Sequence, residues 1–241
     1  MKKLKIIFTA SLVINILFLL LSGILIYKKG GISYITNKIT NQPSKTLFPY
    51  YYDRKDLFSQ LKLSNSDIVF LGDSLTDYNE WSESFNHNSS IVNRGIAGDR
   101  IWGVYDRLDE ITSGHPKKIF LMIGINDLGN GESISSIVTY YQKIIDTVKK
   151  KTPKTDLIIQ SNLPVNDRKN TQALPGVKNS DIIKLNEQVK QLTDKKNVTF
   201  INLYPLFVKK GEMNPSLTTD GVHLNAKGYT IWENVIRKHV Q

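Results

Sequence analysis

Five short apolar runs, rich in β-branched residues, alternate with stretches of helical periodicity, and this alternation constrains the fold more than any other feature of the chain. The apolar runs are DIVFLG (67–72), SIVNRG (90–95), KIFLMIG (118–124), DLIIQSNL (156–163) and VTFINL (198–203). The helical patterns fall at about residues 100–112, 134–151, 181–194 and 225–239. Strands that alternate with helices are typical of a parallel sheet covered on both faces. We therefore predict an α/β domain built on a five-stranded parallel sheet.

Small and polar residues follow the first three predicted strands. Ser74 follows the first strand, Gly98 the second and Asn126 the third, whereas Asp220 and His223 precede the last predicted helix. The carboxyl ends of parallel strands share one rim of the sheet, where ligands of such folds bind. The first three residues can therefore converge there. A loop entering the final helix from the same side can bring the last two to them.

These residue types match what nucleophilic catalysis by serine requires. A serine hydroxyl is a poor nucleophile until a base, most suitably histidine, takes its proton. An acid must hold the imidazole in one tautomer and stabilise the imidazolium, and the spacing Asp220-x-x-His223 lets one loop present both. An oxyanion needs donors, which the N–H of Ser74, the N–H of Gly98 and the amide of Asn126 can supply. The pattern predicts a triad of Ser74, Asp220 and His223 beside this oxyanion hole.

Each of these residues also has a structural interpretation. Ser74 fits a turn that favours small polar residues, and Gly98 fits a turn that needs a positive φ. Asn126 could cap a helix, Asp220 could do the same, and His223 could be a surface histidine. The two interpretations of Gly98 are compatible, because the turn is what aims its N–H. The joint occurrence of all five favours catalysis.

Other polar residues carry weaker signals. His87, His115 and His239 have no partner at motif spacing. Asp73 and Asp99 flank the first two motifs, and we expect them to bond loop N–H groups rather than to bind a metal.

The surroundings of the motifs could shape access to the site. Arg94, Arg100 and Trp102 flank the second motif and could line a pocket or simply pack. The polar loop at 163–179 follows the fourth strand at the same rim, and long loops in such places are often functional.

Four blocks of the sequence carry the catalytic candidates in order. They are Gly72-Asp73-Ser74-Leu75, GIAGD with Gly98, GIND with Asn126, and DGVH with Asp220 and His223. Together, over about residues 66–240, they resemble the GDSL or SGNH hydrolase family. NRGIAGDR and GVHLNAKGY are most similar to its branch of platelet-activating-factor acetylhydrolases and bacterial acetyl esterases. The resemblance implies a flavodoxin-like three-layer α/β/α fold and acyl-ester hydrolysis without a metal or cofactor.

The N-terminus has the pattern of a membrane segment. Residues 6–27 form 22 positions without a charge, flanked by lysines. As a helix they measure about 33 Å, enough to cross a hydrocarbon core of roughly 30 Å. An uncleaved signal-anchor is favoured over a cleaved signal peptide, which has a shorter apolar region. A buried core helix is the remaining alternative. We predict a transmembrane segment at 1–27, a tether at 28–49 and the hydrolase domain at 50–241.

The net charge of +10 does not indicate a nucleic-acid partner. Residues 1–62 carry ten Lys or Arg and two acids, so the remaining 179 residues carry only +2. That disfavours a basic binding face on the domain. The chain has no cysteine, which excludes disulfides, zinc–thiolate sites and a cysteine nucleophile.

These observations predict a membrane-anchored, extracytoplasmic serine esterase that cleaves short acyl esters, such as acetyl, on a glycan or lipid. If the N-terminus is cleaved, the protein is secreted, and the Lys- and Asn-rich composition suggests a low-GC bacterium. An O-acyltransferase would use the same acyl-enzyme, so it remains an alternative. A glycan-binding or assembly protein that kept the fold without activity is the alternative of another class.

Overall fold

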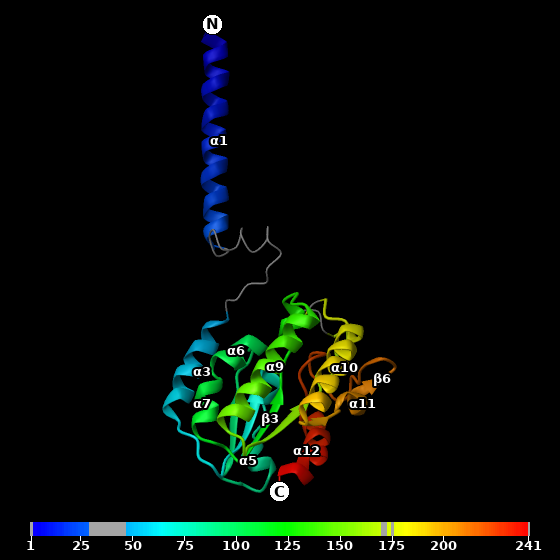
Figure 1. The fold of residues 1–241 in the computed structure, drawn as a ribbon. Helices are drawn as coiled ribbons and strands as arrows, with labels where there is room; N and C mark the ends of the chain where they lie inside the picture. Colours follow the sequence, from blue (N-terminus) through cyan, green and yellow to red (C-terminus); the bar gives the residue numbers. More distant parts are fainter. Residues whose placement is uncertain (1, 29–46, 170–172, 175, 241) are drawn as a thin grey trace. The chain divides into compact units, whose positions relative to one another are not determined.

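The computed structural model describes residues 2–28, 47–169, 173–174 and 176–240 (Figure 1). The chain forms two units, Met1–Thr46 and Leu47–Gln241, and each is described by itself. Residues 29–46 of the predicted tether, and 170–172 and 175 of the loop at 163–179, lie outside the described residues.

The first unit contains one helix, α1 (Lys2–Lys28), over the predicted apolar segment. Its side chains from residue 11 to residue 25 are almost all exposed. Among the described residues, no helix qualifies as long and apolar enough to cross a membrane. The predicted transmembrane segment is therefore not confirmed.

The second unit is built on the predicted five-stranded parallel sheet, with strand order β2-β1-β3-β4-β5. The strands are β1 (Ile68–Gly72), β2 (Ile91–Gly95), β3 (Lys118–Met122), β4 (Asp156–Gln160) and β5 (Thr199–Ile201). This order is that of flavodoxin-like doubly wound sheets, in which the chain changes direction between β1 and β3. The observed strands are shorter than the apolar runs, because those runs continue into buried turns beyond the sheet, as at Ile123.

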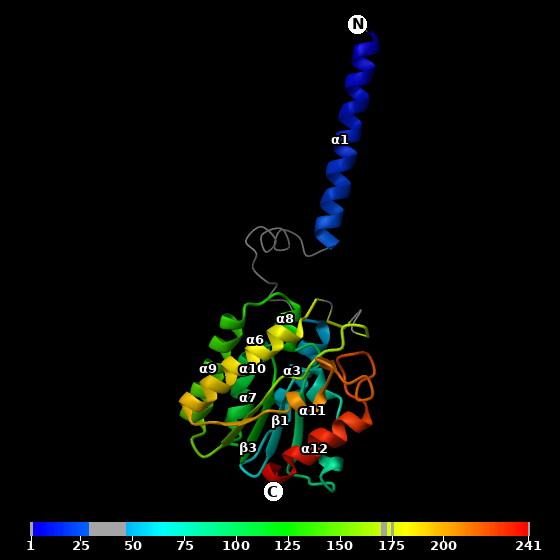
Figure 2. The same ribbon diagram turned by 90° about the vertical axis from the view of Figure 1, so that its right-hand side faces the viewer.

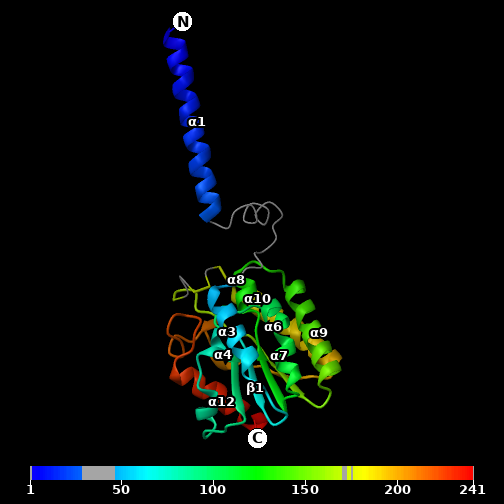
Figure 3. The same ribbon diagram turned by 90° about the vertical axis from the view of Figure 1, so that its left-hand side faces the viewer.

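Helices cover both faces of the sheet. The α-helices are α3 (Pro49–Gln60), α4 (Ser74–Asp77), α5 (Trp81–Ser84), α6 (Ile101–Asp106), α7 (Leu108–Ser113), α8 (Ile125–Gly129), α9 (Ile134–Lys151), α10 (Asn179–Lys196), α11 (Tyr204–Phe207) and α12 (Ala226–Val240). A short hairpin joins β6 (Val208–Lys209) to β7 (Glu212–Met213). Figure 2 shows α9 and α10 on one side of the sheet and α12 on the other, and Figure 3 shows α6 and α7 on the side of α9.

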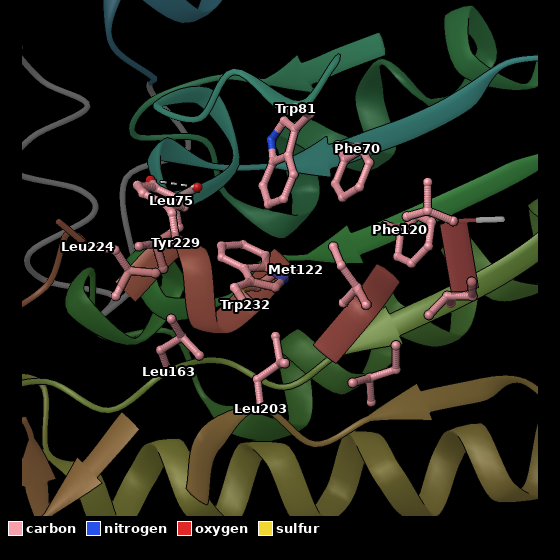
Figure 4. Close-up of a cluster of buried hydrophobic side chains, with 14 of the residues drawn as sticks. Phe70, Leu75, Trp81, Phe120, Met122, Leu163, Leu203, Leu224, Tyr229 and Trp232 are labelled. Carbon is pink, nitrogen blue, oxygen red and sulfur yellow. Dashed lines mark hydrogen bonds between the residues drawn. The ribbon is translucent and has the colours of Figure 1, made fainter. Parts of the chain in front are cut away.

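The core follows from the alternation of side chains along each strand. Ile68 and Phe70 of β1 face the layer of α5, α11 and α12, while Val69 and Leu71 face α6, α7, α9 and α10. On the first face, the ring of Phe70 stacks on Trp81 with centroids 4.1 Å apart (Figure 4). Two apolar layers on one sheet give the three-layer arrangement that the sequence predicts.

The single helix predicted at about 100–112 is divided into two helices in the structure. The pattern at 100–112 forms α6 and α7, which meet at Arg107. Arg107 has φ −105° and ψ 13°, and its buried guanidinium donates to the carbonyl of Arg94 at 2.9 Å and to Asp99. Periodicity does not reveal the break, because the apolar face continues across it.

Candidate active site

The turn after β1 is shaped by tight packing and a helix cap. A Cβ on Gly72 would lie 2.4 Å from the carbonyl oxygen of Met122, so only glycine fits there. Asp73 is the N-cap of α4, and its carboxylate accepts the N–H of Leu75 at 3.1 Å. On the same face of the sheet, the Tyr229 hydroxyl of α12 donates to the carbonyl of Leu75 at 3.0 Å (Figure 4). Ser74 thus begins a short helix that is held at Leu75 by both of these hydrogen bonds.

The structure brings the three predicted triad side chains into one hydrogen-bonded line. His223 Nε2 lies 2.9 Å from Ser74 Oγ, and His223 Nδ1 lies 2.6 Å from Asp220 Oδ2. These separations are the ones a nucleophile, its base and an orienting acid require. Ser74 keeps 7% of its surface exposed, so the line can be reached from solvent. The roles of the three residues stay predictions.

The loop that carries Asp220 and His223 is held by its own hydrogen bonds. Asp220 Oδ1 accepts the N–H groups of Val222 at 2.9 Å and of His223 at 2.8 Å. Partial burial acts to raise the pKa of Asp220, but hydrogen bonds from the His223 ring and these N–H groups outweigh it, and its pKa lies below the ordinary value. Asp220 lies well before the start of α12, so it does not cap that helix. The carboxylate is therefore kept ionised where it faces the imidazole.

The predicted oxyanion donors lie on the turns after β2 and β3. Gly98 has φ +77°, the conformation that its turn was expected to need. Asn126 is the second residue of α8 and not its cap, and its amide donates to the carbonyl of Asp99 at 2.9 Å. Within the part of the chain that the structure describes, no acceptor bonds the N–H of Ser74 or of Gly98.

Three buried aspartates each neighbour one of these donors. Asp73 precedes Ser74, Asp99 follows Gly98 and Asp127 follows Asn126. Asp73 and Asp99 bond loop N–H groups, as expected, and Asp127 accepts the N–H of Ile101 at 3.0 Å. Sequence reasoning missed Asp127, although its place directly after Asn126 was a signal.

Burial controls the protonation of this cluster. Removal from water raises the pKa of Asp73 to about 7, of Asp99 to about 6 and of Asp127 to about 7. The pKa of Asp99 is raised least, because the Arg107 guanidinium lies 3.0 Å from its carboxylate. Nothing in the sequence pattern pointed to Arg107. Among the described residues, no group of three or more acidic, His or Cys side chains is arranged to hold a metal ion.

Replacing Asp73 by asparagine should flatten the pH dependence of stability. The folded chain holds the Asp73 proton up to about pH 7, whereas an unfolded aspartate loses it near pH 4. The contribution of Asp73 to the free energy of unfolding is therefore complete below about pH 4, and it is lost as the pH rises through 7. The unfolding free energy of Asp73→Asn relative to wild type should rise between pH 4 and 8, by up to about 4 kcal/mol.

Urea denaturation at several pH values measures this difference. Exposed Asp53→Asn is the matched control, because it makes the same substitution on the surface of the same domain. A difference between Asp73→Asn and wild type that does not change with pH would contradict the raised pKa.

Asn93, which the sequence did not single out, joins the first two motifs. Its amide lies 3.1 Å from the carbonyl oxygens of Thr76, Asp77 and Asn79, and its side-chain oxygen accepts the N–H of Gly95 at 2.8 Å. One side chain in the middle of β2 thereby bonds the backbone at and just beyond the carboxyl end of α4.

Arg94, Arg100 and Trp102, which flank the second motif and could line a pocket, have different surroundings in the structure. Arg94 is buried, with its guanidinium 4.7 Å from the ring centroid of Phe58, and Arg100 is buried too. Trp102 packs against the cluster that contains Tyr51. The side chain that does flank the site is Tyr78, which is 56% exposed and whose ring centroid lies 5.1 Å from that of His223.

The loop at 163–179 supports the histidine loop. Asn166 donates its N–H to the carbonyl of Gly221 at 2.8 Å and its amide to Met213 at 2.9 Å. The loop therefore contacts the segment between Asp220 and His223.

The three other histidines lie elsewhere in the fold. His87 and His115 occupy left-handed turn positions, and His239 lies at the end of α12.

The fold and the sequence of this chain are similar to those of known proteins. A Streptococcus pneumoniae protein, described as a platelet activating factor, superposes with a TM-score of 0.76 at 27% identity, over 87% of this chain and 99% of its own. An acetyl-xylooligosaccharide esterase from Geobacillus stearothermophilus shares the fold, with a TM-score of 0.60 at 17% identity over 74% of this chain and 95% of its own.

Among curated proteins, an N-acylneuraminate cytidylyltransferase of Escherichia coli is 29% identical over 182 residues, which are 74% of this chain and 41% of that protein. The chain thus spans about two fifths of the length of this relative. Residues 70–231 match the GDSL-like Lipase/Acylhydrolase family, and this stretch holds Ser74, Gly98, Asn126, Asp220 and His223. The chain belongs to the GDSL-like lipase/acylhydrolase family.

Proposed function

We propose that this protein is a serine esterase that hydrolyses short acyl esters carried by a glycan or lipid. The observation that carries the proposal is the continuous line from Asp220 through His223 to Ser74, with separations of 2.6 and 2.9 Å. A serine whose hydroxyl meets an oriented imidazole is activated for attack on a carbonyl. Membership of the acylhydrolase family supports the same reaction.

The reaction begins when Ser74 Oγ attacks the ester carbonyl carbon and its proton passes to His223 Nε2. Asp220 accepts the Nδ1–H and stabilises the imidazolium. The carbonyl oxygen becomes an oxyanion, to which the N–H groups of Ser74 and Gly98 and the Asn126 amide donate. Collapse of this intermediate breaks the bond to the alcohol oxygen, which takes the proton from His223. Water, activated by the same imidazole, then releases the acid and restores Ser74.

Acetyl esters of sugars are the substrate class that the comparisons support. Two solved structures that share this fold are named as an acetyl-xylooligosaccharide esterase and an acetyl xylan esterase. The curated relatives are named for N-acylneuraminate, a sugar whose N-acyl group is an amide, so their name supports a sugar carrier and not the ester bond itself. Tyr78 beside His223 offers an exposed aromatic face, which suits the apolar face of a sugar ring.

The location is proposed from the sequence alone. The 22 uncharged residues from 6 to 27, flanked by lysines, support an N-terminal anchor that leaves the esterase outside the cytoplasm. Esters on cell-wall or surface glycans, or on lipids, would then lie within reach of the site.

A fluorophosphonate probe tests the nucleophile and the location together. The full chain should be labelled at Ser74 and should hydrolyse p-nitrophenyl acetate faster than longer acyl esters, and Ser74→Ala should abolish both signals. A membrane-impermeant probe should label Ser74 on intact expressing cells.

Other results of these experiments would contradict the proposal or favour one of the alternative functions. Equal labelling of wild type and Ser74→Ala would exclude the nucleophile, and labelling only after lysis would exclude the extracytoplasmic location. Acyl groups that appear on an added glycan acceptor would mean transfer instead of hydrolysis. Glycan binding without turnover of any ester would favour an inactive binding protein.

A further inference from the structure

Asp77 joins the helix that begins at Ser74 to two distant segments. It is the last residue of α4, and its side chain is largely buried. Its Oδ2 accepts the N–H of Ala97 at 3.0 Å and the hydroxyl of Tyr50 at 3.0 Å. One carboxylate oxygen therefore holds the nucleophile helix, the turn after β2 and the start of α3 together.

The turn that Asp77 contacts is the one that presents Gly98. Its ends are tied by backbone bonds, from the Ile96 N–H to the carbonyl of Gly72 at 3.1 Å and from the Asp99 N–H to the carbonyl of Ile96 at 3.0 Å. Between these two bonds, Asp77 fixes the N–H of Ala97. Because Gly98 follows directly and has φ +77°, the orientation of its N–H depends on how Ala97 is held.

The start of α3 lies against the same turn. A Cβ on Gly98 would come within 2.9 Å of the ring of Phe48, so this ring packs directly on the glycine. The segment is itself anchored, since Leu47 is buried and the Tyr51 hydroxyl donates to the carbonyl of Gly103 at 2.9 Å. Tyr50 belongs to this anchored segment, and its hydroxyl donates to Asp77. Leu47, Phe48, Tyr50 and Tyr51 all precede residue 70, where the family match begins.

We propose that Asp77 and Tyr50 are positioning residues that hold the N–H of Gly98 in the direction required by the oxyanion. The inference rests on the proposed esterase function and deepens it. An oxyanion hole works because its donors are aimed before the charge develops. Asp77 aims the turn, and the Tyr50 hydroxyl orients the Asp77 carboxylate. Neither side chain touches the reacting atoms.

Four variants of the full-length protein separate positioning from general stability. Tyr50→Phe removes one hydroxyl, and Asp77→Ala removes the acceptor. Asp77→Asn keeps an oxygen that can accept both hydrogen bonds. Tyr52→Phe is the matched control, because Tyr52 is exposed and its hydroxyl makes no hydrogen bond to a described residue. The probes are p-nitrophenyl acetate for kcat and KM, and amide hydrogen exchange of the peptide that contains Ala97.

A positioning role predicts losses in kcat at nearly constant KM, because the oxyanion forms only in the transition state. We expect a fall of about 3- to 10-fold for Tyr50→Phe and of about 10- to 100-fold for Asp77→Ala, smaller than the loss of a donor itself. Asp77→Asn should recover most of the kcat, and Tyr52→Phe should match wild type. Exchange at the Ala97 amide should accelerate in Asp77→Ala.

Different results overturn different claims. An inactive wild type would refute the proposed function and this inference with it. If wild type is active and Tyr50→Phe and Asp77→Ala keep its kcat, positioning is refuted while the esterase stands. Equal losses in Asp77→Ala and Asp77→Asn, or losses that follow a lowered unfolding temperature alone, would refute it as well.

Discussion

Replacing His223 by alanine should lower the kcat for ester hydrolysis by about 10⁴-fold or more. His223 Nε2 lies 2.9 Å from Ser74 Oγ, and no other imidazole lies within hydrogen-bond distance of that oxygen in the described residues. Without it the serine proton has no acceptor, and Ser74 remains a weak nucleophile. Steady-state kinetics with p-nitrophenyl acetate measures the loss, and the folded state is checked by thermal unfolding.

The same mechanism predicts that the losses do not add. Because Ser74 and His223 act as one unit, Ser74→Ala/His223→Ala should be almost as active as either single variant. His239→Ala is the control, since this histidine lies at the far end of α12 and should leave kcat unchanged. Losses that multiply in the double variant would show that the two residues act independently.

Replacing Asn126 by alanine should lower kcat by about 100- to 1,000-fold with little change in KM. The amide of Asn126 has two N–H groups, and the bond to the carbonyl of Asp99 at 2.9 Å uses one of them. That bond orients the amide, and the second N–H is free to stabilise the oxyanion. The measurement is kcat and KM for an acetyl ester, together with the rate of fluorophosphonate labelling.

Asn65→Ala is a suitable control for Asn126→Ala. Asn65 is an exposed loop residue before β1, so its replacement removes an amide without touching the site. A kcat for Asn126→Ala within about threefold of wild type would remove Asn126 from the oxyanion hole. A rise in KM at constant kcat would instead assign it to substrate binding.

The buried aspartates show what this site costs in stability. Asp73, Asp99 and Asp127 are removed from water beside the three predicted oxyanion donors, and each has a raised pKa. Buried carboxyls of this kind are costly unless they are protonated or paired. Asp73 caps α4, and Asp127 bonds the start of α6, so both hold donor-bearing turns in place. The hydrogen bonds that these carboxyls accept from Leu75 and Ile101 offset part of the cost.

Much of the fold was predictable from local patterns. Continuous apolar runs and 3.6-residue periodicity are both recorded in neighbouring residues, so the strands and main helices could be located from the sequence. The four motifs were predictable for the same reason, since Asp220-x-x-His223 and the turn around Ser74 are each only a few residues long. The order of the motifs along alternating strands also predicted that Ser74, Gly98 and Asn126 share one rim.

The remaining features depend on residues that are distant in the chain. Asp77 meets Ala97 and Tyr50 across 20 and 27 positions, and Arg107 meets the carbonyl of Arg94 across 13. Local periodicity depends on residues that are close in the sequence and carries no information about such pairs. The break between α6 and α7 and the positioning carboxylate were therefore not predictable.

The sequence by itself therefore determined the class of fold, the strands and the residues able to carry the chemistry. The tertiary structure alone decided that His223 Nε2 lies 2.9 Å from Ser74 Oγ, and that Asp220 and Asn126 serve no helix as caps. The physical reason is that backbone periodicity and turn chemistry act between neighbours. Hydrogen-bond distances between loops are fixed only when the sheet brings the carboxyl ends of its strands together.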